Sequence, residues 1–203
     1  MKPVIGLTGR LGSGKSLVAK KLSQLGACIV DMDKIGRLAV EHNRSVQLEL
    51  EKAFGRSIFD EHHNLRRKKL ADIVFVDERA LARLNSIVHP TMLARARELI
   101  VKEKKRKNCL YIIVDAALLF EIAFQEECDF VVCVTAPLEV CLDRAEQFKN
   151  QSRRQALDRI RSQMPQEEKA KRSDYILENN SGLDHLDESV NKLHTWIMHK
   201  TTE

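Results

Sequence analysis

The residues Gly9-Arg10-Leu11-Gly12-Ser13-Gly14-Lys15-Ser16 have the types and the spacing of a phosphate-binding loop, or P-loop. Glycine permits backbone conformations that a Cβ forbids, so successive N–H groups of such a loop can point at phosphate oxygens. The pattern places the lysine ammonium near the β- and γ-phosphates of a nucleotide and the serine hydroxyl on Mg²⁺. A glycine-rich turn without a ligand is the alternative, and the full pattern between a strand and a helix argues against it. We predict that ATP is bound by Gly12, Ser13, Gly14, Lys15, Ser16 and Leu17, with Lys15 also catalytic and Ser16 also a metal ligand.

Two aspartates follow the next apolar run. Asp31-Met32-Asp33 comes directly after the strand-like residues that end at Val30. In an open parallel sheet the carboxyl ends of the strands border the ligand crevice. One carboxylate could accept the proton of an attacking hydroxyl or orient it toward the γ-phosphorus, whereas the other could cap a helix. The spacing leaves open which aspartate does which.

Two further carboxylates and one histidine are candidates for binding. Asp115 ends the apolar run 112–114 in the manner of a Walker B aspartate, so we predict that it is a metal ligand. Glu121 is either a substrate-binding residue or a residue on a helix surface. His89 follows an apolar helical face, a setting in which a lone histidine is more often structural than catalytic.

The elements that must position these residues alternate between strands and helices. Apolar strand-like runs lie at 4–7, 27–30, 110–114 and 130–135, with helix-period segments between them. This order predicts an α/β fold of the P-loop NTPase type, a three-layer sandwich with a mostly parallel sheet. We expect a single domain over 1–203, with its core at about 1–33, 108–140 and 172–203. Residues 34–107 then form a helical acceptor-binding insertion, and the highly charged tract 141–171 forms a helical lid.

Composition limits the classes of partner. The 203 residues carry a net charge of +5, which suits an anionic partner, but only 5% are aromatic, which leaves little for nucleobases to stack on. The apolar stretches are much shorter than the roughly 20 residues of a membrane-spanning helix. We therefore expect a cytoplasmic monomer or weak homo-oligomer that binds neither nucleic acid nor membrane. The five cysteines are an odd number without a C-x-x-C pair, so we expect buried free thiols.

Taken together, these motifs resemble the dephospho-coenzyme A kinase family over nearly the whole chain. The resemblance begins with Gly6-Leu7-Thr8-Gly9 and the P-loop, and continues through Leu25-Gly26 to Asp33. The later segments that resemble the family are, in order, Leu65-Arg66-Arg67, Val74-Phe75, Leu84 to Pro90, Asp115 to Glu121, Leu142-Asp143-Arg144, Arg161-Ser162-Gln163 and Ser173 to Asn179.

The resemblance implies that the γ-phosphoryl of ATP moves to the ribose 3′-hydroxyl of dephospho-coenzyme A, the last step of coenzyme A synthesis. It implies that Asp33 rather than Asp31 orients or deprotonates that hydroxyl. It also implies substrate contacts from Arg67, His89 and Glu121. By the same resemblance, Arg144 closes on the ATP phosphates as a catalytic lid residue, and Asn179 lies near the adenine side.

The chain departs from the family pattern at three positions. Ala117 and Ser173 replace a usual proline and a usual alanine, which are mild changes. Phe148 stands where the family usually carries a second lid arginine, and losing one such contact costs on the order of 10² to 10³ in rate if nothing compensates. Lys149, Arg153 and Arg154 lie near enough in the sequence to supply the charge.

Two other functions fit part of the pattern. Another small-molecule P-loop kinase would keep the nucleotide site and change the acceptor, and the segment around Arg67 and His89 argues against it. A nucleotide-binding switch protein of the GTPase type usually carries Asn-Lys-x-Asp, whereas residues 191–194 read Asn-Lys-Leu-His. We predict that this stretch belongs to a terminal helix with Val190, Leu193 and Ile197 on its apolar face.

Overall fold

A computed structural model describes residues 2–149, 151–180 and 183–201 of the chain. The chain divides into two compact units. The sheet unit comprises residues 1–31 and 100–203, and the helical unit comprises residues 32–99. Each unit has its own architecture and is described by itself.

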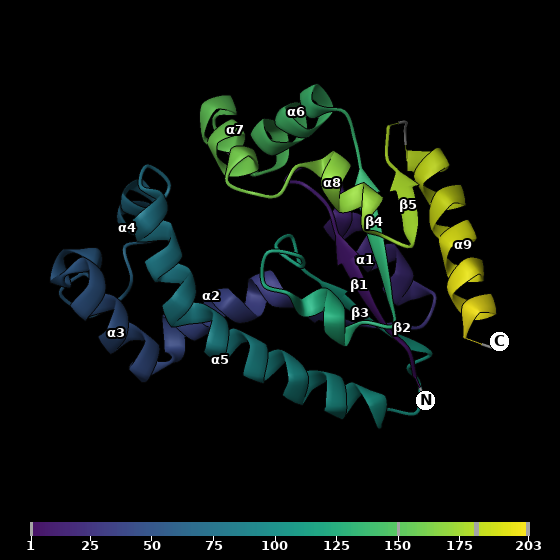
Figure 1. Ribbon diagram of the computed structural model, residues 1–203, viewed down its shortest axis with the longest axis horizontal. Helices are drawn as coiled ribbons and strands as arrows, with labels where there is room; N and C mark the ends of the chain where they lie inside the picture. Colours follow the sequence, from purple (N-terminus) through teal and green to yellow (C-terminus); the bar gives the residue numbers. More distant parts are fainter. Residues whose placement is uncertain (1, 150, 181–182, 202–203) are drawn as a thin grey trace. The chain divides into compact units, whose positions relative to one another are not determined.

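The sheet unit is built on five parallel strands in the order β2-β3-β1-β4-β5 (Figure 1). Their bounds are Val4–Thr8 (β1), Ala27–Asp31 (β2), Tyr111–Asp115 (β3), Phe130–Thr135 (β4) and Tyr175–Glu178 (β5). The predicted α/β class and parallel sheet are therefore confirmed. Because all strands run in one direction, their carboxyl ends share one edge, where Asp31 pairs in register with Asp115.

Side chains alternate between the two faces of this sheet, and each face is covered. Ile5 and Leu7 of β1 belong to a core that includes Leu22 of α1 (Lys15–Gln24) and Leu193 of α9 (Leu183–Lys200). On the opposite face, Gly6 leaves room for the chain that follows β3, since a Cβ on Gly6 would lie 2.6 Å from Leu119 Cδ2. The sheet thus forms the middle layer of a sandwich. The terminal helix is confirmed, with Val190, Leu193 and Ile197 all buried.

In the described part of the chain, three helices lie between β4 and β5, namely α6 (Leu138–Lys149), α7 (Arg153–Arg161) and α8 (Gln166–Lys171). Ser152 and Gln155 form a capping box that starts α7. A small core of Leu142, Ala145 and Ala156 includes Leu11 of the P-loop. This apolar cluster packs α6 and α7 against the P-loop.

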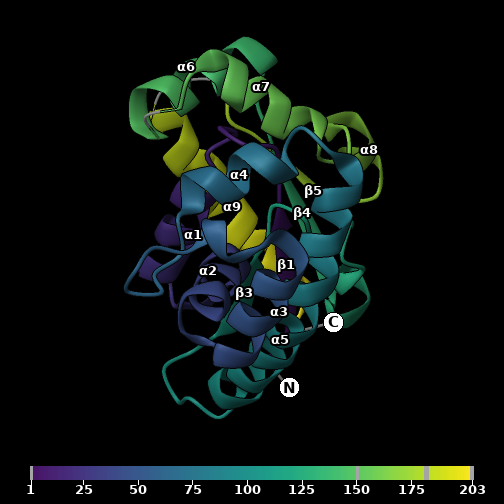
Figure 2. The same cartoon turned by 90° about the vertical axis from the view of Figure 1, so that its left-hand side faces the viewer.

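The helical unit packs its helices around a separate apolar core (Figure 2). Its elements are α2 (Met32–His42), α3 (Arg44–Phe54), the short 3₁₀ helix η1 (Arg56–Ile58), α4 (Arg67–Val74) and most of α5 (Glu78–Lys104). The helical nature of this region was predicted from its apolar spacing. In the core, Leu50, Ile58, Leu70 and Val88 are buried, and Asn43 caps α3 by accepting from the Ser45 and Val46 amides.

Cysteine pairing differs from the prediction. Cys28 of β2 and Cys109 before β3 are joined by a disulfide, with their Cα atoms 5.6 Å apart. Free thiols were the wrong prediction for this pair, because pairing of β2 with β3 brings together two residues that are 81 positions apart. Cys133 and Cys141 are free and buried, as predicted. Among the described helices, none has both the length and the apolar character needed to span a membrane.

Candidate active site

The P-loop joins β1 to α1 and requires glycine where its backbone turns. Gly12 and Gly14 have φ values of 81° and 94°, in the left-handed region. A Cβ on Gly12 would also clash with the backbone of Cys141. Gly14 occupies the N-cap of α1 without a side-chain cap, so the amino end of the helix faces the loop as in phosphate-binding helices. The loop therefore has the local geometry of an anion site.

The lysine of the motif is held by the aspartate that ends β3. Lys15 Nζ forms an ion pair with Asp115 Oδ1, and both side chains are buried. The pairing follows from the sheet, since Asp115 lies opposite Leu7 of β1 in the register, two residues before the loop begins. Two residues predicted independently from the sequence are thus brought together. This carboxylate and the Ser16 hydroxyl at the start of α1 are hard oxygen donors of the kind that Mg²⁺ prefers.

Asn179 connects the end of β5 to the P-loop. Its Nδ2 donates to the Ser13 carbonyl oxygen at 2.8 Å, and its own N–H donates to the Thr135 carbonyl oxygen at 2.8 Å. Asn179 is buried, and a Cβ on Gly14 would clash with its side-chain nitrogen. Residues 166 positions apart in the sequence therefore share one site.

Arg144 on α6 approaches the same loop. Its Nη2 donates to Asn179 Oδ1 at 3.5 Å. Its Nη1 is buried and has no hydrogen-bond partner among the described residues. A Cβ built on Gly14 would lie 3.9 Å from this Nη1, so the atom borders the loop. A buried guanidinium nitrogen without an acceptor is costly unless an anion binds there, and phosphate suits guanidinium geometry.

Glu121 forms an ion pair with Lys169, a lysine that was not predicted as a site residue. Lys169 on α8 is 0% exposed, and its Nζ lies 2.9 Å from Glu121 Oε1. The same ammonium donates to the Ala117 carbonyl oxygen, which also accepts from Thr8 Oγ1 at 3.4 Å. Glu121 further accepts from the Met164 amide at 2.8 Å. This ion pair, in which only Lys169 is buried, links α8, the segment after β3 and the last residue of β1.

Three of the four predicted substrate-binding residues lie in the helical unit, and the fourth, Glu121, lies in the sheet unit. Asp33 is exposed in the first turn of α2. Arg67 forms an ion pair with Glu41. His89 is half-buried in α5, and its burial lowers the pKa of the imidazole from 6.5, so the neutral form is favoured. Asp31, by contrast, belongs to the sheet unit at the carboxyl end of β2.

The lid position that departs from the family pattern carries no charge of its own. Phe148 is 74% exposed at the end of α6. Arg153, one of the suggested replacements, is held on the surface by Glu139 and Asp143. The side chain of Lys149, another suggested replacement, lies outside the described residues.

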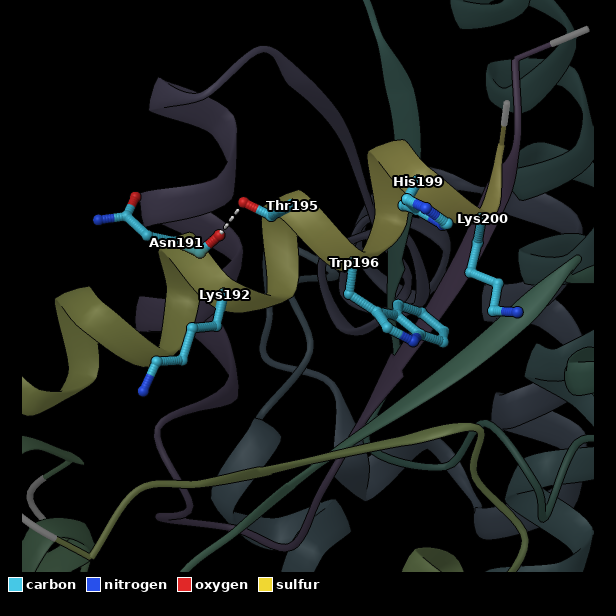
Figure 3. A pocket seen from close by; sticks show the side chains of 6 residues that line it. All are labelled: Asn191, Lys192, Thr195, Trp196, His199 and Lys200. Atoms are coloured by element: carbon cyan, nitrogen blue, oxygen red, sulfur yellow. Dashed lines mark hydrogen bonds between the residues drawn. The ribbon is translucent and has the colours of Figure 1, made fainter. Parts of the chain in front are cut away.

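Two hollows lie near α9. One, of about 230 Å³, adjoins the loop site because Asn179 lines it together with Glu178, Asn180, His185, Leu186 and Ser189. The other, of about 520 Å³, is an open hollow along the last turns of α9, where Thr195 donates to the Asn191 carbonyl oxygen (Figure 3). None of the predicted site residues lines the hollow in Figure 3. Only the first belongs to the candidate site.

Comparison with known proteins agrees with this geometry. The sequence model of one protein family, described as dephospho-CoA kinase, matches residues 3–185. A dephospho-CoA kinase from Fusobacterium nucleatum is 39% identical over 189 residues, which cover 93% of this chain and 95% of that protein. A solved dephospho-CoA kinase from Campylobacter jejuni is 26% identical, with a TM-score of 0.70 over 99% of this chain and 100% of the other. A shikimate kinase from Acinetobacter baumannii, 21% identical with a TM-score of 0.51 over 98% and 96% of the chains, shares the fold.

Proposed function

The chain belongs to the dephospho-CoA kinase family, and from this premise we propose how its residues carry out the reaction. The enzyme transfers the γ-phosphoryl group of ATP to the ribose 3′-hydroxyl of dephospho-CoA, giving CoA and ADP. In this reaction a bond forms between the 3′-oxygen and the γ-phosphorus. The bond from that phosphorus to the β–γ bridging oxygen breaks, and ADP leaves.

The observation that carries the proposal is the buried Arg144 Nη1 beside the P-loop, which has no hydrogen-bond partner among the described residues. Together with the uncapped amino end of α1, it supports a polyphosphate bound by Gly12, Ser13, Gly14, Ser16 and Leu17. Lys15 and Arg144 neutralise the charge that spreads over the transferred phosphoryl group. Asn179, which lines the adjoining hollow, contacts the adenine side.

We assign the chemistry at the acceptor hydroxyl to the carboxylate of Asp33, which follows β2. Asp33 takes the proton of the 3′-hydroxyl as the oxygen attacks, or orients that oxygen in line with the γ-phosphorus. Arg67, His89 and Glu121 bind dephospho-CoA. The neutral imidazole favoured by the lowered pKa of His89 suits a hydrogen bond better than an ion pair.

Mg²⁺ fits the donor set at the carboxyl end of the sheet, where Ser16 and Asp115 would hold it. When bound, it neutralises charge on the β- and γ-phosphates. Residues 34–107 form the acceptor-binding insertion and 141–171 the lid of a single kinase domain. A cytoplasmic location, a monomer or weak homo-oligomer, and the absence of nucleic-acid and membrane partners stay predictions from the sequence.

An acceptor panel tests the proposal. ADP release is measured with ATP and Mg²⁺ in the presence of dephospho-CoA, adenosine, a nucleoside monophosphate or no acceptor. We expect release that depends on dephospho-CoA. Release with another acceptor would retain the kinase and overturn the acceptor assignment, whereas ATP binding without any transfer would favour the switch alternative.

The role of Asp33 is tested by Asp33→Asn, with Asp31→Asn as the matched variant two residues away. Asp33→Asn should leave ATP affinity within about twofold of wild type and lower kcat on the order of 10²-fold or more, as expected for a general base. Full kcat in Asp33→Asn would show that the assignment is wrong. A large loss confined to Asp31→Asn would move the role to that residue.

A further inference from the structure

A cluster of metal-ligating side chains lies on the sheet unit away from the predicted site. It consists of Cys28 in β2, Cys109 before β3 and Glu103 in the last turn of α5. One ligand atom from each, namely two sulfurs and a carboxylate oxygen, lies within 4.8 Å of the other two. All three residues belong to the sheet unit, so their proximity is a property of one compact body.

The surroundings of the cluster suit a negatively charged ligand set. Both cysteines are buried, and the Glu103 side chain is only 17% exposed. Arg106 Nη1 lies 3.4 Å from Glu103 Oε2, and Lys2 donates to the carbonyl oxygens of Glu103 and Arg106. Two cationic groups therefore surround a site that would carry up to three negative charges when both sulfurs are thiolates.

We propose that the reduced Cys28 and Cys109 thiolates, together with Glu103 and a water molecule as the fourth ligand, form a binding site for one Zn²⁺ ion, and that the disulfide is the oxidised, metal-free form of the same site. A cellular dithiol would reduce the disulfide by two electrons, giving two protein thiols and the oxidised dithiol. Zinc binding then displaces the two thiol protons to solvent. The two states exclude each other because the metal and the disulfide use the same sulfur atoms.

The chemical types of the three ligands fit zinc better than harder cations. Thiolates are soft ligands that select Zn²⁺ over Mg²⁺ or Ca²⁺. In tetrahedral geometry with Zn–S bonds of about 2.3 Å, the two sulfurs would be about 3.8 Å apart. The Cys109 Sγ also lies 3.3 Å from the Tyr111 carbonyl oxygen, which can accept a hydrogen bond from the thiol in the reduced, metal-free state.

The site lies where the chain leaves and re-enters the sheet unit. Cys28 lies three residues before the chain leaves the sheet unit at Asp31, and Glu103 lies three residues after it returns at Ile100. Either the disulfide or the metal therefore fastens together the two segments that lead into and out of the helical unit. The proposal is independent of the assigned kinase residues, since none of them belongs to the cluster.

The test is a titration of the full-length chain with Co²⁺, a spectroscopic substitute for Zn²⁺. The protein is first reduced with a phosphine, which is removed under nitrogen. We expect a thiolate-to-cobalt charge-transfer band and the visible bands of a tetrahedral ion, saturating at one equivalent and abolished by added Zn²⁺. The protein oxidised with a disulfide reagent should give neither band.

Variants locate the site. Cys28→Ser and Cys109→Ser should each remove the charge-transfer band, and Glu103→Gln should weaken Co²⁺ affinity by roughly tenfold or more. The matched control is Cys128→Ser, because burial raises the pKa of that thiol to about 12 and it lies outside the cluster. Circular dichroism checks that each variant is folded. Absence of the band in the folded, reduced wild-type chain, or its persistence in Cys28→Ser with Cys109→Ser, would overturn the proposal.

Discussion

The ion pair between the buried Lys169 and the partly exposed Glu121 allows a stability effect to be estimated from the structure. We consider Lys169→Met, which shortens the unbranched side chain by one heavy atom and removes its charge. Lys169 is fully buried, so the substitution itself adds no exposed apolar surface. Its effect is to leave Glu121 without its ammonium partner at 2.9 Å and the Ala117 carbonyl without a donor.

The expected loss follows from the exposure of the carboxylate that remains. Removing one partner of a fully buried pair costs roughly 3 to 5 kcal/mol. Glu121 keeps 22% of its side-chain exposure and still accepts from the Met164 amide, which reduces the penalty. We therefore expect the free energy of unfolding to fall by about 2 to 3 kcal/mol.

Urea unfolding followed by circular dichroism measures this loss. Lys171→Met is the matched control, since this lysine is exposed on the same helix and its loss should change stability by less than about 0.5 kcal/mol. The double variant Lys169→Met with Glu121→Gln should regain part of the loss, because no partly buried carboxylate without its ammonium partner remains. If Lys169→Met were as stable as Lys171→Met, the ion pair between Lys169 and Glu121 would not contribute to stability.

Three further predictions concern the loop, the helical unit and the lid. Gly12→Ala should lower the free energy of unfolding more than Gly55→Ala does. Both glycines have φ of 81°, but only at Gly12 would an added Cβ clash with another part of the chain, the Cys141 backbone. Equal losses in urea unfolding would contradict this prediction. Burial lowers the pKa of His89 in the folded chain, so the contribution of the neutral imidazole to stability should be complete above pH 6.5 and decline as the pH falls through the lowered native pKa. His89→Gln should flatten that part of the profile of urea midpoint against pH. An unchanged slope in this variant would contradict the assignment to His89. Phe148→Arg should raise kcat on the order of tenfold or more, whereas Phe148→Gln should not, and equal kcat values in steady-state assays would show that the lid needs no second arginine.

The central strands were predictable because burial on both faces produces continuous apolar runs. β1 and β3 read as such runs, and every residue in both strands is buried. β5 was not predicted as a strand. It lies at the edge of the sheet, and among Tyr175–Glu178 only Leu177 is buried, so its sequence lacks the pattern of a core strand.

The candidate site was predictable where its chemistry is local in the sequence. The P-loop needs a contiguous set of glycines and a lysine, and its geometry followed from that pattern. The contact of Asn179 with Ser13 and the pairing of Lys169 with Glu121 depend on tertiary packing between distant segments. A lysine in the charged helix α8 has no sequence signal that marks it as buried. The Cys28–Cys109 disulfide was missed for the same reason.

The decisive measurement is the position of the new phosphate in the product. The enzyme is incubated with ATP, Mg²⁺ and dephospho-CoA, and the purified product is examined by phosphorus NMR and mass spectrometry. The proposed function predicts one added phosphate, present as a monoester on the ribose 3′-oxygen. A product phosphorylated at another position, or dephospho-CoA recovered unchanged while ATP is hydrolysed, would contradict it.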